Sequence, residues 1–138
     1  MNKILLPIDI SQSEATTHVL DHARKLAKGF DVNFVLLHVL DPIPAMVEAN
    51  IPAEVLSGHE ASAKAKLEEL AKIYEIDGKS QFVVLRGRPQ HEILRVAEST
   101  GSDLIVIASH QPVASDILLG SVAASVVRHA HCSVMVLR

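Results

Sequence analysis

Residues 34–39 read Phe-Val-Leu-Leu-His-Val, a short run whose apolar side chains fall on both faces of a strand. A strand of this kind is covered above and below, as the strands of parallel sheets are. Residues 104–108, Leu-Ile-Val-Ile-Ala, form a second run of the same kind. We therefore predict two interior strands of one parallel sheet.

Segments with helical spacing alternate with apolar runs along the whole chain. The expected strands are residues 2–8, 34–39, 80–86, 104–108 and 134–137, and the expected helices are residues 13–29, 54–76, 90–99 and 120–128. Such alternation implies right-handed crossovers and one parallel sheet between two helical layers. The prediction is a single α/β domain over residues 1–138: a five-stranded parallel sheet flanked by helices on both faces, Rossmann-like.

Two further expectations concern the segments between the second and third strands. Residues 41–52 carry three prolines, so we predict a long connection there. In the helix that follows, five apolar side chains recur at helical steps and are expected to face inward: Val55, Ala63, Leu67, Leu70 and Ile73.

Composition narrows the class of protein. The chain has 138 residues, 49% of them hydrophobic, and a formal net charge of -3. The hydrophobic fraction is large enough to form a packed core. The net charge is negative, which argues against a protein that binds nucleic acid or a membrane surface through positive charge. Met1 leads into a strand without a signal peptide, and no run approaches eighteen apolar residues, so we expect a cytoplasmic protein. The lone Cys132 is expected to be a buried, unreactive thiol.

Three apparent motifs are rejected. Gly78-Lys79-Ser80 ends like a phosphate-binding P-loop, but Ile73 stands where its leading glycine is needed. No two glycines are two residues apart, which excludes a G-x-G-x-x-G dinucleotide motif. His18 and His22 lie one helical turn apart, and without a third ligand in sight we interpret them as helix surface rather than as a metal site.

Ligands of open parallel sheets bind beyond the carboxyl ends of the strands. This rule selects residues 7–11, 39–41, 87–89 and 109–121. In the last of these, Gly120 and Ser121 open a helix, whose first N–H groups could hold phosphate oxygens. The alternative, left open here, is that Ser121 caps the helix and Gly120 only shapes the turn.

The carboxyl-terminal third carries a recognisable pattern: Ala-Ser-His-Gln-Pro at residues 108–112, Leu-Leu-Gly-Ser at residues 118–121, and Val-Val-Arg-His-Ala-His-Cys-Ser-Val-Met-Val-Leu-Arg at residues 126–138. Ile-Leu-Leu-Pro-Ile-Asp at residues 4–9, Leu-Leu-His-Val at residues 36–39 and Gly-Arg-Pro at residues 87–89 agree with it in order. The chain resembles the universal stress proteins, and within them the bacterial F type.

This resemblance implies an adenine nucleotide α-hydrolase-like fold, ATP or another adenine nucleotide as ligand, with Mg²⁺, and a homodimer paired through residues 134–137. Asp9 matches the acidic residue near the ribose, Pro7 and Val39 match the adenine wall, and residues 120–122 match the phosphate-holding helix start. Ala108 and Gln111 replace two glycines of the family's loop, and Asp116 adds a carboxylate there. The binding residues so predicted are Pro7, Ile8, Asp9, Val39, Ala108, Ser109, His110, Gln111, Pro112, Gly120, Ser121 and Val122.

Three functions are weighed on this basis. The first is a nucleotide-dependent regulatory module of the stress response, with an unknown protein partner. The second is a weak ATPase or phosphotransferase, for which only His110 and Asp9 are candidates. The third is a nucleotide-free dimeric adaptor that uses the apolar segment 42–52.

Overall fold

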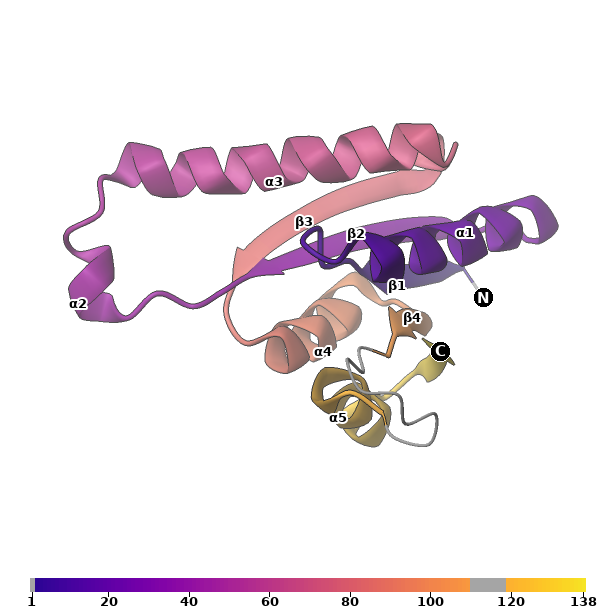
Figure 1. Cartoon of the computed structure of the whole chain (residues 1–138). Helices are drawn as coiled ribbons and strands as arrows, with labels where there is room; N and C mark the ends of the chain where they lie inside the picture. The colour runs from indigo at the N-terminus through magenta and orange to yellow at the C-terminus, as the bar shows by residue number, and fades with distance from the viewer. Residues whose placement is uncertain (1, 110–118) are drawn as a thin grey trace.

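The computed structural model describes residues 2–109 and 119–138 (Figure 1). Its elements, in chain order, are β1 (Lys3–Pro7), α1 (Ser13–Gly29), β2 (Asn33–Leu40), α2 (Ala45–Glu48), α3 (Ala53–Ile73), the 3-10 helix η1 (Asp77–Lys79), β3 (Ser80–Arg86), α4 (Pro89–Thr100), β4 (Leu104–Ala108), α5 (Ser121–His129) and β5 (Ser133–Leu137). The strands form one parallel sheet in the order β3-β2-β1-β4-β5. The predicted α/β fold is thereby confirmed.

Both faces of the sheet are buried under helices. Phe34 and Leu36 of β2 pack with α1 and α3, whereas Val35 and Leu37 pack with α4 and α5. All four side chains are at most 1% exposed. The doubly apolar run therefore lies where its pattern predicted. In the part of the chain that is described, no helix is both long enough and apolar enough to cross a membrane.

Helix α3 differs from its sequence-based expectation at both ends. Ala63 and Leu67 are buried as predicted, but Val55 is 44% and Ile73 is 60% exposed. A helix of 21 residues is about 31 Å long, whereas a seven-residue strand spans about 23 Å. The ends of α3 therefore overhang the sheet, and Ile76, beyond the helix, fills the core instead.

The connection predicted at residues 41–52 contains one helical turn, α2, which spacing alone did not predict. Pro44 and Pro52 immediately precede α2 and α3, where a missing N–H costs no helical hydrogen bond. In Figure 1 the turn stands apart from the layered body, and Met46 on it is 84% exposed.

Gly58 in the middle of α3 offers a test of the helix assignment. Nothing lies within 4 Å of the position that a Cβ would take, and the residue is exposed. Gly58→Ala is expected to raise the free energy of unfolding by about 0.5–1 kcal/mol, because alanine loses less backbone entropy in a helix. Urea denaturation followed by circular dichroism would measure it, and a decrease would mean that residue 58 is not helical.

Candidate functional site

The central strand of the sheet ends in a proline. The carbonyl of Lys3 points toward β4 and accepts a hydrogen bond from Asp103 N–H (2.9 Å). The N–H of Ile8 points toward β2 and donates to the carbonyl of Leu37 (2.8 Å). Since backbone groups of a strand alternate in direction, residue 7 faces β4. Pro7 has no N–H to offer there.

The two neighbours of β1 are consequently paired to different lengths. The ladder to β2 runs as far as Pro7 and Leu37, but the ladder to β4 stops at Leu5 and Ile105. Here the strand order also reverses, because β2 and β4 lie on opposite sides of β1. The strands part at their carboxyl ends, at the kind of switch point where such sheets bind ligands.

A cavity of about 170 Å³ opens at this point. Eight of the residues predicted for binding line it: Pro7, Ile8, Asp9, Val39, Ala108, Gly120, Ser121 and Val122. Ser109 does not line it, but its hydroxyl accepts the N–H of Gly120 at 3.2 Å. His110, Gln111 and Pro112 lie outside the described residues, as does Asp116.

Asp9 lies on the loop between β1 and α1 and is exposed at the cavity. Its Oδ1 accepts the N–H and the hydroxyl of Ser11, at 3.0 and 2.5 Å. Its carbonyl accepts Gln12 N–H (2.9 Å) and the Thr16 hydroxyl (2.8 Å). Four hydrogen bonds thus fix the residue, while Oδ2 has no hydrogen-bond partner in the described part of the chain and can accept one from a ligand.

His38 also lines the cavity, and the sequence analysis missed it. Only 7% exposed, it donates from Nδ1 to the carbonyl of Ile8 at 2.9 Å. Ile8, itself 3% exposed, is therefore held by both backbone groups, since its N–H bonds Leu37. The available signal was a lone polar side chain within an otherwise apolar interior strand.

Other lining residues come from helices rather than from strand ends. Residues 15, 16 and 19 of α1, Ile93 of α4 and Ala123 of α5 all contribute. The rule that inspects the residues after each strand could not select them, because they reach the cavity only through packing of helices onto the sheet.

The start of α5 presents backbone N–H donors to the cavity. Gly120 is the N-cap, and its carbonyl accepts the first helical bond, from Ala124 N–H (2.9 Å). The N–H groups of Ser121, Val122 and Ala123 have no acceptor within residues 2–109 and 119–138. Ser121 is the first helical residue, so it does not cap the helix. Three donors at the positive end of the helix therefore border the cavity.

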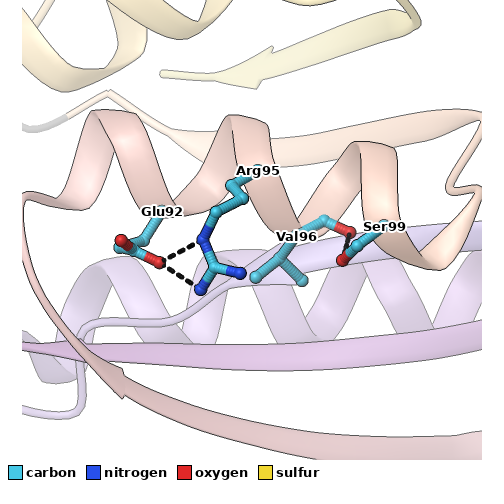
Figure 2. Close-up of polar contacts among 4 residues, drawn as sticks. All are labelled: Glu92, Arg95, Val96 and Ser99. Atoms are coloured by element: carbon cyan, nitrogen blue, oxygen red, sulfur yellow. Dashed lines mark hydrogen bonds and ion pairs between the residues drawn. The ribbon is translucent and has the colours of Figure 1, made fainter.

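Helix α4 approaches the cavity behind a tight turn at Gly87. The backbone there has φ +156°, and a Cβ would lie 2.9 Å from Cγ of Glu92. Figure 2 shows Glu92 held along the helix by Arg95, whose Nε and Nη2 donate to Oε2 at 2.9 and 2.6 Å, while Ser99 donates to the Val96 carbonyl one turn on. Glycine at residue 87 therefore lets the turn pass close to Glu92 in the first turn of α4. Pro89, the first residue of α4, lines the cavity.

The residues considered for metal binding or reactivity lie elsewhere. His22 Nδ1 donates to the carbonyl of His18 (3.0 Å), and within the described ranges no three His, Cys, Asp or Glu side chains could hold a metal ion together. Cys132 is half-buried rather than buried. Burial, and secondarily the charge of Asp103, raise the pKa of its thiol.

A second, more open groove of about 620 Å³ lies on the α3 side of the sheet. It shares the β1–α1 loop with the cavity, through Ile10, and is lined by His59, Lys66 and Glu69 of α3. Lys66 and Glu69 face each other at 4.0 Å with both side chains largely exposed, so this ion pair adds little stability.

The sequence profile of the universal stress protein family matches residues 1–138. The chain belongs to the universal stress protein family. Universal stress protein G of Shigella flexneri is 33% identical over 139 residues, covering 98% of this chain and 97% of that protein. Universal stress protein MJ0531 of Methanocaldococcus jannaschii is 32% identical over 142 residues, covering 99% and 81%.

Solved structures of similar proteins share the fold. The structure of hypothetical protein MJ0577 superposes with a TM-score of 0.81 at 31% identity, covering 99% of this chain and 94% of that one. A universal stress protein in complex with cAMP (TM-score 0.70, 17% identity, 99% and 96% covered) and one from Archaeoglobus fulgidus in complex with dAMP (0.71, 22%, 100% and 98%) are more distant. These last two universal stress proteins therefore bind adenine nucleotides.

Proposed function

We propose that this protein binds an adenine nucleotide in the cavity between the carboxyl ends of β1 and β4. One observation carries the proposal: three N–H groups at the start of α5 and Oδ2 of Asp9, all without a hydrogen-bond partner among the described residues, border the same apolar cavity. Amides of a helix start suit phosphate oxygens, and a carboxylate oxygen suits a sugar hydroxyl. The nucleotide complexes of other family members support the same ligand class.

In this arrangement each part of the nucleotide meets a complementary group. The purine lies between Pro7 and Val39, a ribose hydroxyl donates to Asp9 Oδ2, and the phosphates accept from Ser121 and Val122. ATP with Mg²⁺ is one such ligand. The purine end of the nucleotide therefore lies at the strand ends, and its phosphate end lies at the start of α5.

Calorimetric titration with AMP and ATP tests the proposal, together with mass spectrometry of protein purified without added nucleotide. Saturable one-site binding, or a co-purified adenine nucleotide, is the expected result. An empty protein that ignores both nucleotides at millimolar concentration would refute it. Appearance of ADP from bound ATP would instead favour the weak ATPase.

We infer that nucleotide occupancy regulates contacts with a protein partner in the cytoplasm during stress. The F-type assignment belongs to the same proposal and rests on Ile-Ala-Ser-His at residues 107–110, Pro112 and the ending at residues 128–138.

The proposed homodimer pairs β5 of two copies. β5 is the outer strand of the sheet, and the carbonyl of Leu137 faces inward, where it accepts Ser109 N–H (2.8 Å). By alternation, the N–H and carbonyl of Val136 face the open edge. Such an edge can pair with a second strand.

Val136→Pro is therefore expected to give a monomer, because it removes an outward N–H while the bonds to β4 remain. Light scattering after size-exclusion chromatography would show the change in mass. Val136→Ala is the matched control, since it keeps the N–H and should remain dimeric. A proline variant that is still dimeric would place the interface elsewhere.

A nucleotide-free adaptor is the second candidate function, and the connection at residues 41–52, which contains α2, supports it. Met46 is 84% and Val47 is 50% exposed there, on a segment that stands away from the sheet. Exposed apolar side chains that cluster on one segment are typical of contact surfaces. This role predicts no nucleotide binding, so the titrations above separate the two.

A further inference from the structure

We infer that Ser109 is a positioning residue of the nucleotide site: it holds the start of α5 in place without touching the nucleotide. The inference rests on the proposed function and adds a residue to it. Ser109 does not line the cavity, but it bonds both the outer strand of the sheet and the residue that begins α5.

The backbone of Ser109 is fixed to the sheet. Ser109 directly follows β4, and its N–H donates to the carbonyl of Leu137 at 2.8 Å. This bond continues the pairing of β4 with β5 by one residue, since the last registered pair is Ala108 with Leu137. The serine side chain therefore leaves from a backbone that the sheet holds in position.

The side chain of Ser109 reaches the start of α5. Its Oγ accepts the N–H of Gly120 at 3.2 Å, and the carbonyl of Gly120 accepts Ala124 N–H at 2.9 Å. Both backbone groups of Gly120 are thus engaged, one toward the sheet and one along the helix. The helix has no side-chain cap, and no other side chain in the described part of the chain bonds residues 120–123. The Ser109 hydroxyl is therefore the polar link between the end of β4 and the first N–H groups of α5.

Apolar packing alone does not fix where α5 begins. Ala123 and Val126 of α5 are buried among apolar side chains of the sheet and of α4. Contacts of this kind have no preferred direction, whereas a hydrogen bond constrains both distance and angle. A binding site needs its groups within about 0.5 Å of the productive geometry. Without the Ser109 bond, we expect α5 to stay packed while its first N–H groups are no longer held in that geometry.

Ser109→Ala tests the inference, because it removes Oγ and leaves the backbone bond to Leu137. We expect this variant to bind AMP about tenfold more weakly than the unmodified protein in calorimetric titrations. Ser109→Thr, which keeps a hydroxyl, should restore the affinity to within about twofold. Equal affinity of Ser109→Ala and the unmodified protein would overturn the role of Ser109 and leave the proposed function standing. Absence of AMP binding by the unmodified protein would instead refute the proposed function.

Ser102→Ala is the matched control for a purely structural effect. Ser102 lies just before β4, at the end of the strand away from the cavity, and is buried. Its hydroxyl lies 2.8 Å from the hydroxyl of Thr100. This variant should lose thermal stability and still bind AMP like the unmodified protein. If Ser102→Ala weakened AMP binding as much as Ser109→Ala does, a general loss of stability would explain both, and Ser109 would have no positioning role.

Amide hydrogen exchange of the unmodified protein tests the bond itself, whether or not a variant folds. Without nucleotide, the N–H of Gly120 should exchange more slowly than those of Ser121 and Val122, which have no acceptor among the described residues. AMP should then slow the exchange at Ser121 and Val122. If the amide of Gly120 exchanged as fast as these two in protein that binds AMP, the bond to Ser109 would be absent and the inference overturned.

Discussion

Gly120→Val is expected to lower the affinity for AMP by at least about a hundredfold, or about 2.7 kcal/mol, in a protein that stays folded. Gly120 is buried in the cavity wall directly before the N–H groups of Ser121, Val122 and Ala123. A valine side chain there would occupy the space through which a phosphate approaches these groups. The backbone has φ −61° and ψ 154°, which valine adopts without strain, so space alone is altered.

Calorimetry gives the affinity, and thermal unfolding shows whether the variant is folded. Gly58→Ala serves as the control, because Gly58 is an exposed residue of α3 away from the cavity. This variant should bind AMP like the unmodified protein. If a folded Gly120→Val protein bound AMP with undiminished affinity, the start of α5 would not be part of the binding site.

His38→Leu is expected to lower the free energy of unfolding by about 1–3 kcal/mol and to weaken nucleotide binding at the same time. Leucine fills the space but leaves the buried carbonyl of Ile8 without its donor, since that carbonyl accepts from His38 Nδ1 at 2.9 Å. Ile8 directly precedes Asp9, so the loop that carries the proposed ribose contact loses one of its supports.

The conservative variant His38→Asn separates positioning from packing. Its side-chain amide places an N–H close to where Nδ1 stands and should restore much of the binding, even though it fills less space. Denaturant unfolding and calorimetry on both variants measure the two effects. If His38→Leu bound AMP as tightly as the unmodified protein, His38 would have no part in positioning the loop.

Most of the fold follows from local pattern. The doubly apolar runs at residues 34–39 and 104–108 can be satisfied only between two helical layers, and the structure places them there. Helix ends were harder to predict. Val55 and Ile73 continue the apolar spacing of α3, but whether they are buried depends on the length of the sheet beneath, which spacing does not contain.

The candidate site was predictable where it follows strand ends and not where it depends on packing. Asp9 follows β1, Val39 lies at the carboxyl end of β2, and Gly120 directly precedes α5. All three line the cavity. The role of His38 was not predicted, because it depends on a tertiary hydrogen bond to a residue thirty positions earlier in the chain. Pro7 was predicted as a wall of the site, but its effect on pairing with β4 required knowledge of the strand order.

Backbone amide NMR during titration with AMP tests the central claim most directly. The account predicts that the largest shifts fall on the N–H groups of Ser121 and Val122, accompanied by shifts at Asp9 and Val39 on the opposite wall. Shifts confined to the α3 groove around His59 and Lys66, with the amides at the start of α5 unmoved, would contradict it.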